Sequence, residues 1–301
     1  MSKDKTGKAK KNRAPATSNS SQERLNALQK TGDSRVKNGL TCPGQAARLD
    51  GYRVDNGERE STDVSGTSIF DPVLCELAYR WFTAKGDSIL DPFAGGSVRG
   101  IVAGMLGRHY TGIDLSARQI DANRAQLRDI KCEPIPAWIV GDSREQVKAL
   151  PDKARFDLVF SCPPYYDLEV YSEDGRDLST LDTYDKFMAA YRAIIADCVA
   201  RLNDDRFACM VVGDIRDKRG CYRNFPADTT AAFMAAGMTL YNEAVLVTAV
   251  GSLPLRAGRA FSANRKLGKT HQNVLVYVKG DPHKAAKHCG EVDVALPEGM
   301  A

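Results

Sequence analysis

The residues of this chain that are best suited to chemistry lie in two short runs, residues 89–97 and residues 157–167. The second run contains Ser-Cys-Pro-Pro-Tyr at positions 161–165, directly after an apolar segment of strand length. Because proline has a fixed φ and no amide hydrogen, the carbonyls of Cys162 and Pro163 should be rigid and lack their usual partners. Such a loop suits a planar amine. The Pro163 carbonyl would accept a hydrogen bond from the amine, and the Tyr165 ring would stack on the ring that carries it. A plain Pro-Pro turn with a packing tyrosine is the alternative interpretation. The predicted catalytic residues are Cys162, Pro163, Pro164 and Tyr165.

The first run reads Asp-Pro-Phe-Ala-Gly-Gly-Ser at positions 91–97. It places an acid at a strand end, followed by two glycines where the backbone must turn and come close to a ligand. A nicotinamide site would need Gly-x-Gly-x-x-Gly, and the spacing of Gly95, Gly96 and Gly100 differs from it, which argues against a dehydrogenase. Asp91 is expected to face outward and to accept from a positively charged group.

Two further acids stand at the ends of the next predicted strands. Asp114 lies nineteen residues after Gly95, where a carboxylate can accept from both hydroxyls of a ribose. Asp142 ends the third strand and is placed to accept from an adenine amino group. Taken alone, each acid is as well explained by a helix cap or a surface position. Three acids at successive strand ends favour a nucleoside site.

Together these residues resemble the S-adenosylmethionine-dependent amino-methyltransferases of DNA, the N6-adenine and N4-cytosine enzymes of bacteria and phages. The family's cofactor motif resembles residues 91–95, its catalytic motif Asp/Asn/Ser-Pro-Pro-Tyr resembles residues 162–165, and the likeness covers roughly residues 68–280. The resemblance implies S-adenosyl-L-methionine as cofactor and DNA as partner. It also implies that the helix beginning near Phe70 helps to enclose the methionine end. The predicted cofactor-binding residues are Phe70, Asp91, Pro92, Phe93, Gly95, Gly96, Asp114 and Asp142.

Two positions depart from the family pattern. The cofactor motif usually has a second glycine two residues after the first, whereas this chain reads Gly-Gly-Ser at positions 95–97, so the backbone path can differ slightly. Cys162 stands where the family has Asp, Asn or Ser. Because a thiol is a weak acceptor, most of the polarisation of the amine falls to the Pro163 carbonyl, or Ser161 contributes.

The implied reaction is methyl transfer to an exocyclic amine, at N6 of adenine or N4 of cytosine. Hydrogen bonds to fixed carbonyls favour the pyramidal amine, so catalysis depends on positioning and preorganised electrostatics. A duplex base must flip out to reach the loop, and stacking on Tyr165 would offset about 1 to 3 kcal/mol of that cost. The same motif serves enzymes that methylate RNA bases or a protein glutamine amide. Cys162 also suits a catalytically weak DNA-binding protein that kept the fold.

Basic residues gather in two segments that should reach the same edge of the sheet, residues 214–223 and residues 256–269. Lys and Arg there could neutralise phosphates, and Arg could read guanine. An ordinary charged surface explains any single one of them equally well. No insertion is large enough for an elaborate recognition domain, so recognition should be short or loose. The predicted DNA-binding residues are Arg216, Arg219, Arg223, Arg256, Arg259, Arg265 and Lys269.

The elements that must position these residues follow from the apolar periodicity. Five strands alternate with helices, and two later strands have no helical pattern between them. Alternation implies right-handed crossovers, so the predicted fold class is α/β: a Rossmann-like, seven-stranded, mostly parallel sheet with a C-terminal antiparallel hairpin, as in class I methyltransferases. The predicted strands are residues 88–91, 110–114, 137–140, 156–161, 207–212, 240–250 and 272–278. The predicted helices are residues 71–82, 98–106, 116–129, 182–202 and 226–236, with a short helix after residue 143.

The charge is uneven along the 301 residues. Residues 1–40 carry ten Lys or Arg against three acids, and the rest of the chain sums to about minus three of the net +4. The first segment is also rich in Ser, Asn, Lys and Gly, which predicts a disordered basic arm. An irregular lead-in (residues 41–67), a methyltransferase domain (residues 68–280) and a polar tail (residues 281–301) should follow it.

The remaining composition predicts an intracellular, cytoplasmic protein, and the sequence leaves open whether it is a monomer or a homodimer. No apolar run reaches membrane-spanning length, and the start of the chain shows no secretory pattern. Eight cysteines without a Cys-x-x-Cys pair suggest a reducing compartment. His283, His288 and Cys289 form the only metal-like cluster, and they are expected to be solvated, so no metal is predicted. Restriction-modification is the setting that the resemblance suggests.

Overall fold

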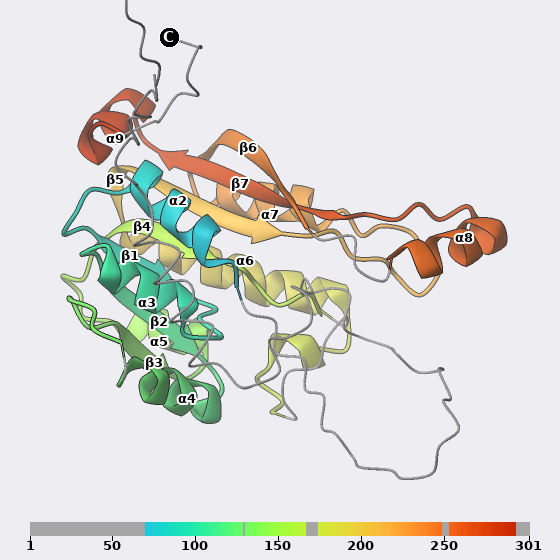
Figure 1. The fold of residues 1–301 in the computed structure, drawn as a ribbon, viewed down its shortest axis with the longest axis horizontal. Helices are drawn as coiled ribbons and strands as arrows, with labels where there is room; N and C mark the ends of the chain where they lie inside the picture. Colours follow the sequence, from blue (N-terminus) through green and yellow to red (C-terminus); the bar gives the residue numbers. More distant parts are fainter. Residues whose placement is uncertain (1–69, 129, 167–173, 249–252, 293–301) are drawn as a thin grey trace, which may run out of the picture. The chain divides into compact units, whose positions relative to one another are not determined.

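The computed structural model describes residues 70–128, 130–166, 174–248 and 253–292, all within the unit formed by residues 39–301 (Figure 1). The predicted basic arm and lead-in lie outside the described residues, and the predicted domain boundaries stay predictions. Within the part of the chain that is described, no helix has the length and apolar character needed to cross a membrane.

Seven strands form one sheet in the order β3-β2-β1-β4-β5-β7-β6. Strands β1 to β5 pair in parallel, and β7 runs antiparallel between β5 and β6. This arrangement confirms the predicted fold class, although β5 begins at Leu202 and not at residue 207. The strands are β1 (Ser88–Asp91), β2 (His109–Asp114), β3 (Ala137–Val140), β4 (Phe156–Ser161), β5 (Leu202–Val212), β6 (Thr239–Val247) and β7 (His271–Lys279).

The topology collects distant segments at one edge of the sheet. Because β1 to β5 are parallel, the loops that follow them open at the same edge, which we call the carboxyl edge. Since β7 is antiparallel to both β5 and β6, the end of β6 and the start of β7 also reach this edge. The glycine turn after β1, the Pro-Pro loop after β4 and both basic segments therefore lie at the carboxyl edge.

Helices cover both faces of the sheet (Figure 1). Neighbouring residues of β4 point to opposite faces: Phe160 meets Tyr79 of α2 edge-on, with ring centroids 5.3 Å apart, whereas Val159 joins the core that contains α6. One layer packs α2 (Pro72–Phe82) against α3 (Val98–Met105) and α9 (Pro282–Cys289). The other packs α6 (Tyr184–Arg201) against α5 (Ser143–Ala149) and α7 (Phe225–Ala235), while α4 (Ala117–Leu127) lies on β2 and β3.

The predicted helix starts can be checked at their caps. The Asp71 carboxylate accepts from the amides of Val73 and Leu74 and so caps the N-terminus of α2, where the predicted helix begins. At the start of α4, Ser116 and Gln119 have the spacing of a capping box, but only half of it forms. The Ser116 hydroxyl accepts from the Gln119 amide, but the Gln119 side chain donates to Asn123 and does not return to Ser116.

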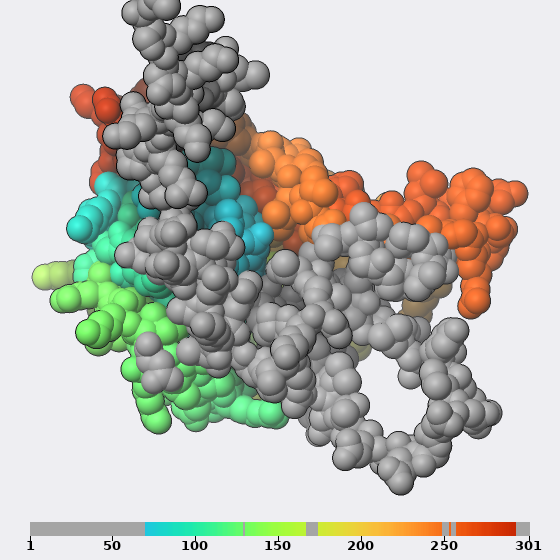
Figure 2. All heavy atoms as spheres, in the orientation of Figure 1, coloured from blue at the N-terminus to red at the C-terminus, as the bar shows by residue number. Residues whose placement is uncertain are grey.

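Two α-helices of the described residues were not predicted. Helix α8 (Leu253–Asn264) lies between β6 and β7, where the sequence predicted no helix. Figure 1 shows it in orange-red at the end of the β6–β7 hairpin, and Figure 2 shows the atoms of this segment in the same colour. Its apolar residues at helical spacing, Leu253, Ala257 and Phe261, form only a short stripe, and a proline and a glycine interrupt the segment. Helix α9 lies within the predicted polar tail, where only Ala285 is buried.

Candidate active site

The glycine turn and the Pro-Pro loop lie side by side at the carboxyl edge. Strand β1 pairs directly with β4. The hydroxyl of Ser161, the last residue of β4, donates to the carboxylate of Asp91, the last residue of β1, with 2.5 Å between the oxygens. Both side chains are fully buried. One buried contact thus joins two motifs that are far apart in the sequence, as a shared site requires.

Asp91 does not face outward, contrary to the prediction. Its carboxylate is fully buried and accepts at Oδ1 from the Ser161 hydroxyl and the Phe93 amide. At Oδ2 it accepts from Arg99 Nε and from the Tyr110 hydroxyl, each at 2.6 Å. A carboxylate offers about four lone-pair sites, so the protein saturates this one. The cation that pairs with Asp91 is Arg99 of the chain itself, because a buried charge must be paired.

Arg99 ties this ion pair to the glycine turn. It lies in the first turn of α3, and its guanidinium donates to the carbonyls of Phe93 and Ala94 at 2.5 and 2.9 Å. The same group lies 4.6 Å from the centroid of the Phe70 ring. Burial lowers the pKa of Arg99, but the charge and hydrogen bond of Asp91, with further contributions from Tyr110 and Cys162, together raise it by more, so the net pKa is raised and the guanidinium stays protonated. A permanent cation therefore holds the turn.

The glycine turn is fixed on its inner side and open on its outer side. Gly95 has a φ of +51°, in the left-handed region that favours glycine. Its amide donates to Asp114 Oδ2 at 2.8 Å, and its carbonyl accepts from Asn123 Nδ2 at 2.7 Å. A Cβ built at Gly95 or Gly96 would meet no atom of the described residues within 4 Å. Burial raises the pKa of Asp114 against the opposing hydrogen bonds from the Ser116 and Gly95 amides.

Asp142 is a helix cap in this structure. It accepts from the Arg144 amide at 2.8 Å and forms an ion pair of 2.5 Å with the Arg144 guanidinium. The adjacent Ser143 hydroxyl donates to the Pro92 carbonyl at 2.5 Å and so joins the start of α5 to the glycine turn. The capping interpretation holds for Asp142, and its contact with adenine stays a prediction.

The Pro-Pro loop presents an acceptor, as the two prolines predict. Pro163 is buried and Pro164 is half-buried. Among the described residues, no donor binds the Pro163 carbonyl oxygen. The half-buried thiol of Cys162 lies 3.9 Å from the Tyr165 hydroxyl. The oxygen that could accept from an amine is therefore that of Pro163.

Tyr165 is not placed to stack on a base. Its side chain is 3% exposed, and its ring meets Phe225 edge-on with centroids 6.2 Å apart. Its hydroxyl accepts from the Gly213 amide at 3.0 Å and from the Gln272 side chain at 2.7 Å. These contacts fasten the loop to the ends of β5 and β7. The predicted stacking is wrong for this structure, because protein covers the ring.

The two basic segments meet around one groove at the carboxyl edge, with a volume of about 930 Å³. Among the described residues that line this basic groove, none is acidic. The Arg216 guanidinium lies 3.7 Å from the centroid of the Tyr222 ring, which is 44% exposed. His271 also lines the groove and precedes Gln272, so the groove adjoins the Pro-Pro loop. The cations of the lining are Arg216, Lys218, Arg219, Arg265, Lys266 and Lys269.

The groove contains four of the seven predicted DNA-binding residues, namely Arg216, Arg219, Arg265 and Lys269. Arg259 is exposed on α8 outside the lining. Arg256 belongs to α8, but its side chain lies outside the described residues. Arg223 lies elsewhere, with its guanidinium carbon 5.0 Å from the centroid of Tyr166 and 4.8 Å from that of Tyr184.

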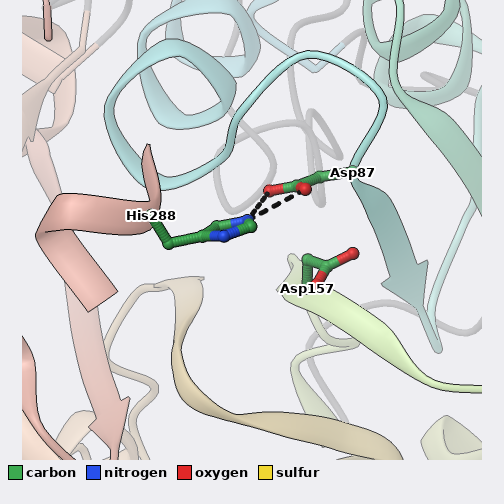
Figure 3. A group of neighbouring side chains, drawn as sticks. All are labelled: Asp87, Asp157 and His288. Carbon is green, nitrogen blue, oxygen red and sulfur yellow. Dashed lines mark hydrogen bonds and ion pairs between the residues drawn. The ribbon is translucent and has the colours of Figure 1, made fainter. Parts of the chain in front are cut away.

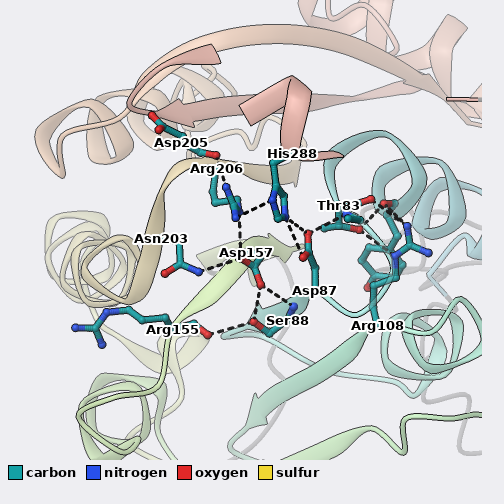
Figure 4. Close-up of polar contacts among 12 residues, drawn as sticks. Thr83, Asp87, Ser88, Arg108, Arg155, Asp157, Asn203, Asp205, Arg206 and His288 are labelled. Carbon is teal, nitrogen blue, oxygen red and sulfur yellow. Dashed lines mark hydrogen bonds and ion pairs between the residues drawn. The ribbon is translucent and has the colours of Figure 1, made fainter. Parts of the chain in front are cut away.

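A second polar cluster lies at the opposite edge of the sheet, which we call the amino edge. Ligand atoms of Asp87, Asp157 and His288 lie within 4.8 Å of one another (Figure 3). The expectation that His288 is solvated is wrong, because its Nε2 lies 2.8 Å from Asp87 Oδ2. Arg206 contacts Asp157 Oδ1 and His288 Nδ1, each at 3.0 Å (Figure 4). The cluster already contains its own cation and is an ion-pair network between β1, β4, β5 and α9.

Comparison with known proteins supports the resemblance over part of the chain. Residues 3–125 match the family model described as DNA methylase. The resemblance to the DNA methylases is confirmed. The DNA methylase match includes the glycine turn and ends before the Pro-Pro loop, so the second motif is seen only in the sequence and the structure. No curated protein matches the chain.

Solved methyltransferase structures show similar folds. TrmN from Thermus thermophilus is 17% identical with a TM-score of 0.46, and the match covers 70% of this chain and 49% of TrmN, about half its length. A TehB-like SAM-dependent methyltransferase from Corynebacterium glutamicum is 16% identical with a TM-score of 0.41, and the match covers 71% of this chain and 90% of that protein. A Thermus thermophilus protein provisionally named a DNA modification methylase is 17% identical with a TM-score of 0.35, and the match covers 47% of this chain and 51% of that protein.

The sequence did not reveal the side chains that hold the glycine turn. Arg99 left one signal, because it is a lone cation in the first turn of an apolar helix, eight residues after Asp91. A buried cation needs a nearby acid, so this pairing could have been proposed from the sequence. Asn123 left no signal, because its bond to the Gly95 carbonyl spans 28 residues.

Proposed function

We propose that this chain transfers a methyl group from S-adenosyl-L-methionine to an exocyclic amine of a base in DNA, at N6 of adenine or N4 of cytosine. The observation that carries the proposal is the buried hydrogen bond from Ser161 to Asp91, because it joins the Pro-Pro loop to the open glycine turn. The match to the DNA methylase family supports the reaction class and the choice of DNA.

The residues at the ends of β1 and β2 fit this cofactor. Gly95 and Gly96 border open space, which a ligand can approach closely. Each carboxylate oxygen of Asp114 accepts one backbone amide, from Gly95 or from Ser116, and so retains a lone pair for a ribose hydroxyl. Asp114 is therefore a better ligand group than the saturated Asp91. When bound, S-adenosyl-L-methionine supplies a methyl group on a sulfonium, which is already a good leaving group.

The chain's own task is to hold and polarise the amine. The lone pair of an exocyclic amine is delocalised into its ring, which makes the amine a poor nucleophile. Pro163 is rigid, and its carbonyl can accept from an amine hydrogen and favour the pyramidal form. Cys162 is a weak acceptor, and its sulfur lies beside the Tyr165 hydroxyl, so we assign it to the support of the loop. Orientation of the amine supplies most of the rate enhancement.

We assign DNA binding to the basic groove. Its six cations can neutralise phosphates without reading sequence, which suits the absence of a large recognition insertion in the described residues. Tyr222 is exposed and stacked on Arg216, and it offers a planar surface for a base. Because the groove adjoins the Pro-Pro loop, a base extruded from a strand bound there would have a short path to the Pro163 carbonyl.

Nucleoside analysis tests the proposal. Unmethylated DNA, RNA and a protein mixture are each incubated with the chain and methyl-labelled S-adenosyl-L-methionine, hydrolysed and analysed by mass spectrometry. We expect labelled N6-methyladenine or N4-methylcytosine from DNA. Label only in RNA or only in glutamine would replace DNA as the substrate class. DNA binding without any methyl transfer would favour a binding protein that kept the fold.

A further inference from the structure

Arg223 occupies a different environment from the arginines of the basic groove. It lies in the loop between β5 and α7, and its amide donates to the Ile215 carbonyl at 2.8 Å. Its guanidinium carbon lies about equally far from two rings, 5.0 Å from the Tyr166 centroid and 4.8 Å from the Tyr184 centroid. The Nε atom is buried and has no hydrogen-bond partner in the part of the chain that the structure describes. The guanidinium is therefore held by aromatic faces.

Tyr166 directly follows the Pro-Pro-Tyr sequence and has a strained backbone. Its φ is +45°, which L residues other than glycine rarely adopt and which persists only where the surroundings enforce it. Its side chain is 5% exposed and packs against Tyr184 and Phe187, with ring centroids 5.7 and 5.5 Å apart. Tyr184 is fixed in turn, because its hydroxyl donates to Asp228 at 2.7 Å. The rings of Tyr166, Tyr184 and Phe187 thus hold the end of the Pro-Pro loop.

We propose that Arg223 is a positioning residue for methyl transfer. By stacking on Tyr166 and Tyr184 it maintains the strained turn that follows the two prolines, and through that turn it fixes the Pro163 carbonyl. A cation over a ring is attracted more strongly when it is desolvated, as the buried Nε of Arg223 is. A planar guanidinium can stack on aromatic faces as a compact ammonium cannot. This inference rests on the proposed function.

The test compares Arg223→Ala and Arg223→Lys with Arg219→Ala. Arg219 is the matched control, since it lies in the same loop, lines the groove and has a side chain that is 84% exposed. We expect Arg223→Ala to lower kcat by about 10- to 100-fold, with no change in the Kd for DNA or in its salt dependence. Lysine should not restore kcat. Arg219→Ala should instead raise the KM for DNA and reduce the slope of log Kd against log salt by about 0.9.

Thermal unfolding and calorimetric binding of S-adenosyl-L-methionine establish that each variant is folded. If Arg223→Ala does not fold, Arg223→Lys decides alone: a loss of kcat at unchanged Kd supports the proposal. Wild-type kcat in Arg223→Lys overturns it. An Arg223→Ala variant that keeps kcat but loses salt dependence as Arg219→Ala does would make Arg223 a phosphate contact and overturn the proposal. A wild-type chain that methylates nothing overturns the proposed function as well, whereas an active wild type with an unaffected Arg223→Ala overturns this inference only.

Discussion

The Tyr165 hydroxyl joins three segments of the carboxyl edge. It belongs to the Pro-Pro loop and accepts from the Gly213 amide after β5 and from the Gln272 side chain on β7. A partly buried amide that loses its acceptor costs about 1–3 kcal/mol. The hydroxyl therefore holds the loop against the sheet, and this role is separate from any contact of the ring with a base.

Tyr165→Phe distinguishes the two roles. Phenylalanine keeps the ring but leaves the Gly213 amide and the Gln272 side chain without this acceptor. We expect kcat to fall about tenfold, because the loop is less well fixed, while the affinity for S-adenosyl-L-methionine stays the same. Tyr241→Phe, on the exposed strand β6, is the control. Steady-state kinetics provide the measurement, and wild-type kcat in Tyr165→Phe would show that the hydroxyl does not position the loop.

At the scale of elements, the glycine turn combines a strained conformation with an open outer surface. Gly95→Ala should reduce the free energy of unfolding by roughly 1 kcal/mol, because the φ of +51° at position 95 is unfavourable for alanine. The added methyl group would also project into the open space where the cofactor is proposed to bind. We therefore expect a rise of more than about tenfold in the Kd for S-adenosyl-L-methionine, more than 1.4 kcal/mol.

Gly86→Ala is the matched control for that prediction. Gly86 also has a positive φ, +92°, and open space around its missing Cβ, but it precedes β1 at the amino edge. It should lose a similar amount of stability and keep its cofactor affinity. Calorimetric titration measures the Kd for S-adenosyl-L-methionine, and thermal unfolding measures the loss of stability. Equal cofactor affinity in Gly95→Ala and the wild type would count against the proposed cofactor site.

The amino-edge network joins strands through Asp157. Burial raises the pKa of Asp157, but hydrogen bonds from Ser88, Asn203 and Arg206 lower it by more, so the net pKa lies below its usual value. A carboxyl group with a lowered folded-state pKa stabilises the fold above its ordinary pKa. That stabilisation is lost as the pH falls through the lowered value.

Asp157→Asn should therefore lower the free energy of unfolding by about 1–3 kcal/mol at pH 7. The difference from the wild type should begin to shrink as the pH falls below about 4, the ordinary pKa of aspartate, and should shrink further through the lowered folded-state pKa, where the wild-type carboxyl also becomes neutral. Asp121→Asn, a surface acid with a side chain 75% exposed, is the control and should change little. Denaturant unfolding at several pH values measures this, and a difference that is constant with pH would contradict the account.

The sequence predicted the buried elements well because apolar runs and glycine turns are local signals. Strands β1, β3 and β4 have the predicted bounds. Helix α9 was missed because it is polar and buries only Ala285 against the core. The sequence also predicted which residue types form the site, but it did not predict where their side chains point. Asp91 points into the protein because Arg99, Tyr110 and Ser161 donate hydrogen bonds to its carboxylate. Contacts between distant segments of this kind have no fixed spacing in the sequence.

For the whole molecule, charge is distributed so that one groove is basic. The chain has a net charge of +4, yet residues 41–301 together sum to about minus three. The six cations of the basic groove therefore stand out against an acidic remainder. Such a concentration of one sign focuses the field and steers a polyanion toward the carboxyl edge.

Salt dependence of DNA binding checks this assignment. Lys218→Ala and Lys266→Ala together should weaken DNA binding and reduce the slope of log Kd against log salt by about 1.8, if each lysine neutralises one phosphate. Lys85→Ala, exposed at the amino edge, is the control. Fluorescence anisotropy over a range of salt concentrations measures the slopes. Equal slopes for the groove variant and the Lys85 variant would contradict the placement of DNA in the groove.

The most direct measurement of the central claim is a crystal structure of the chain with a non-reactive cofactor analogue and a short DNA duplex. We expect the analogue over Gly95 and Gly96 and an extruded base whose amine lies about 3 Å from the Pro163 carbonyl oxygen. An analogue bound elsewhere, or a base amine out of reach of that oxygen, would contradict the account.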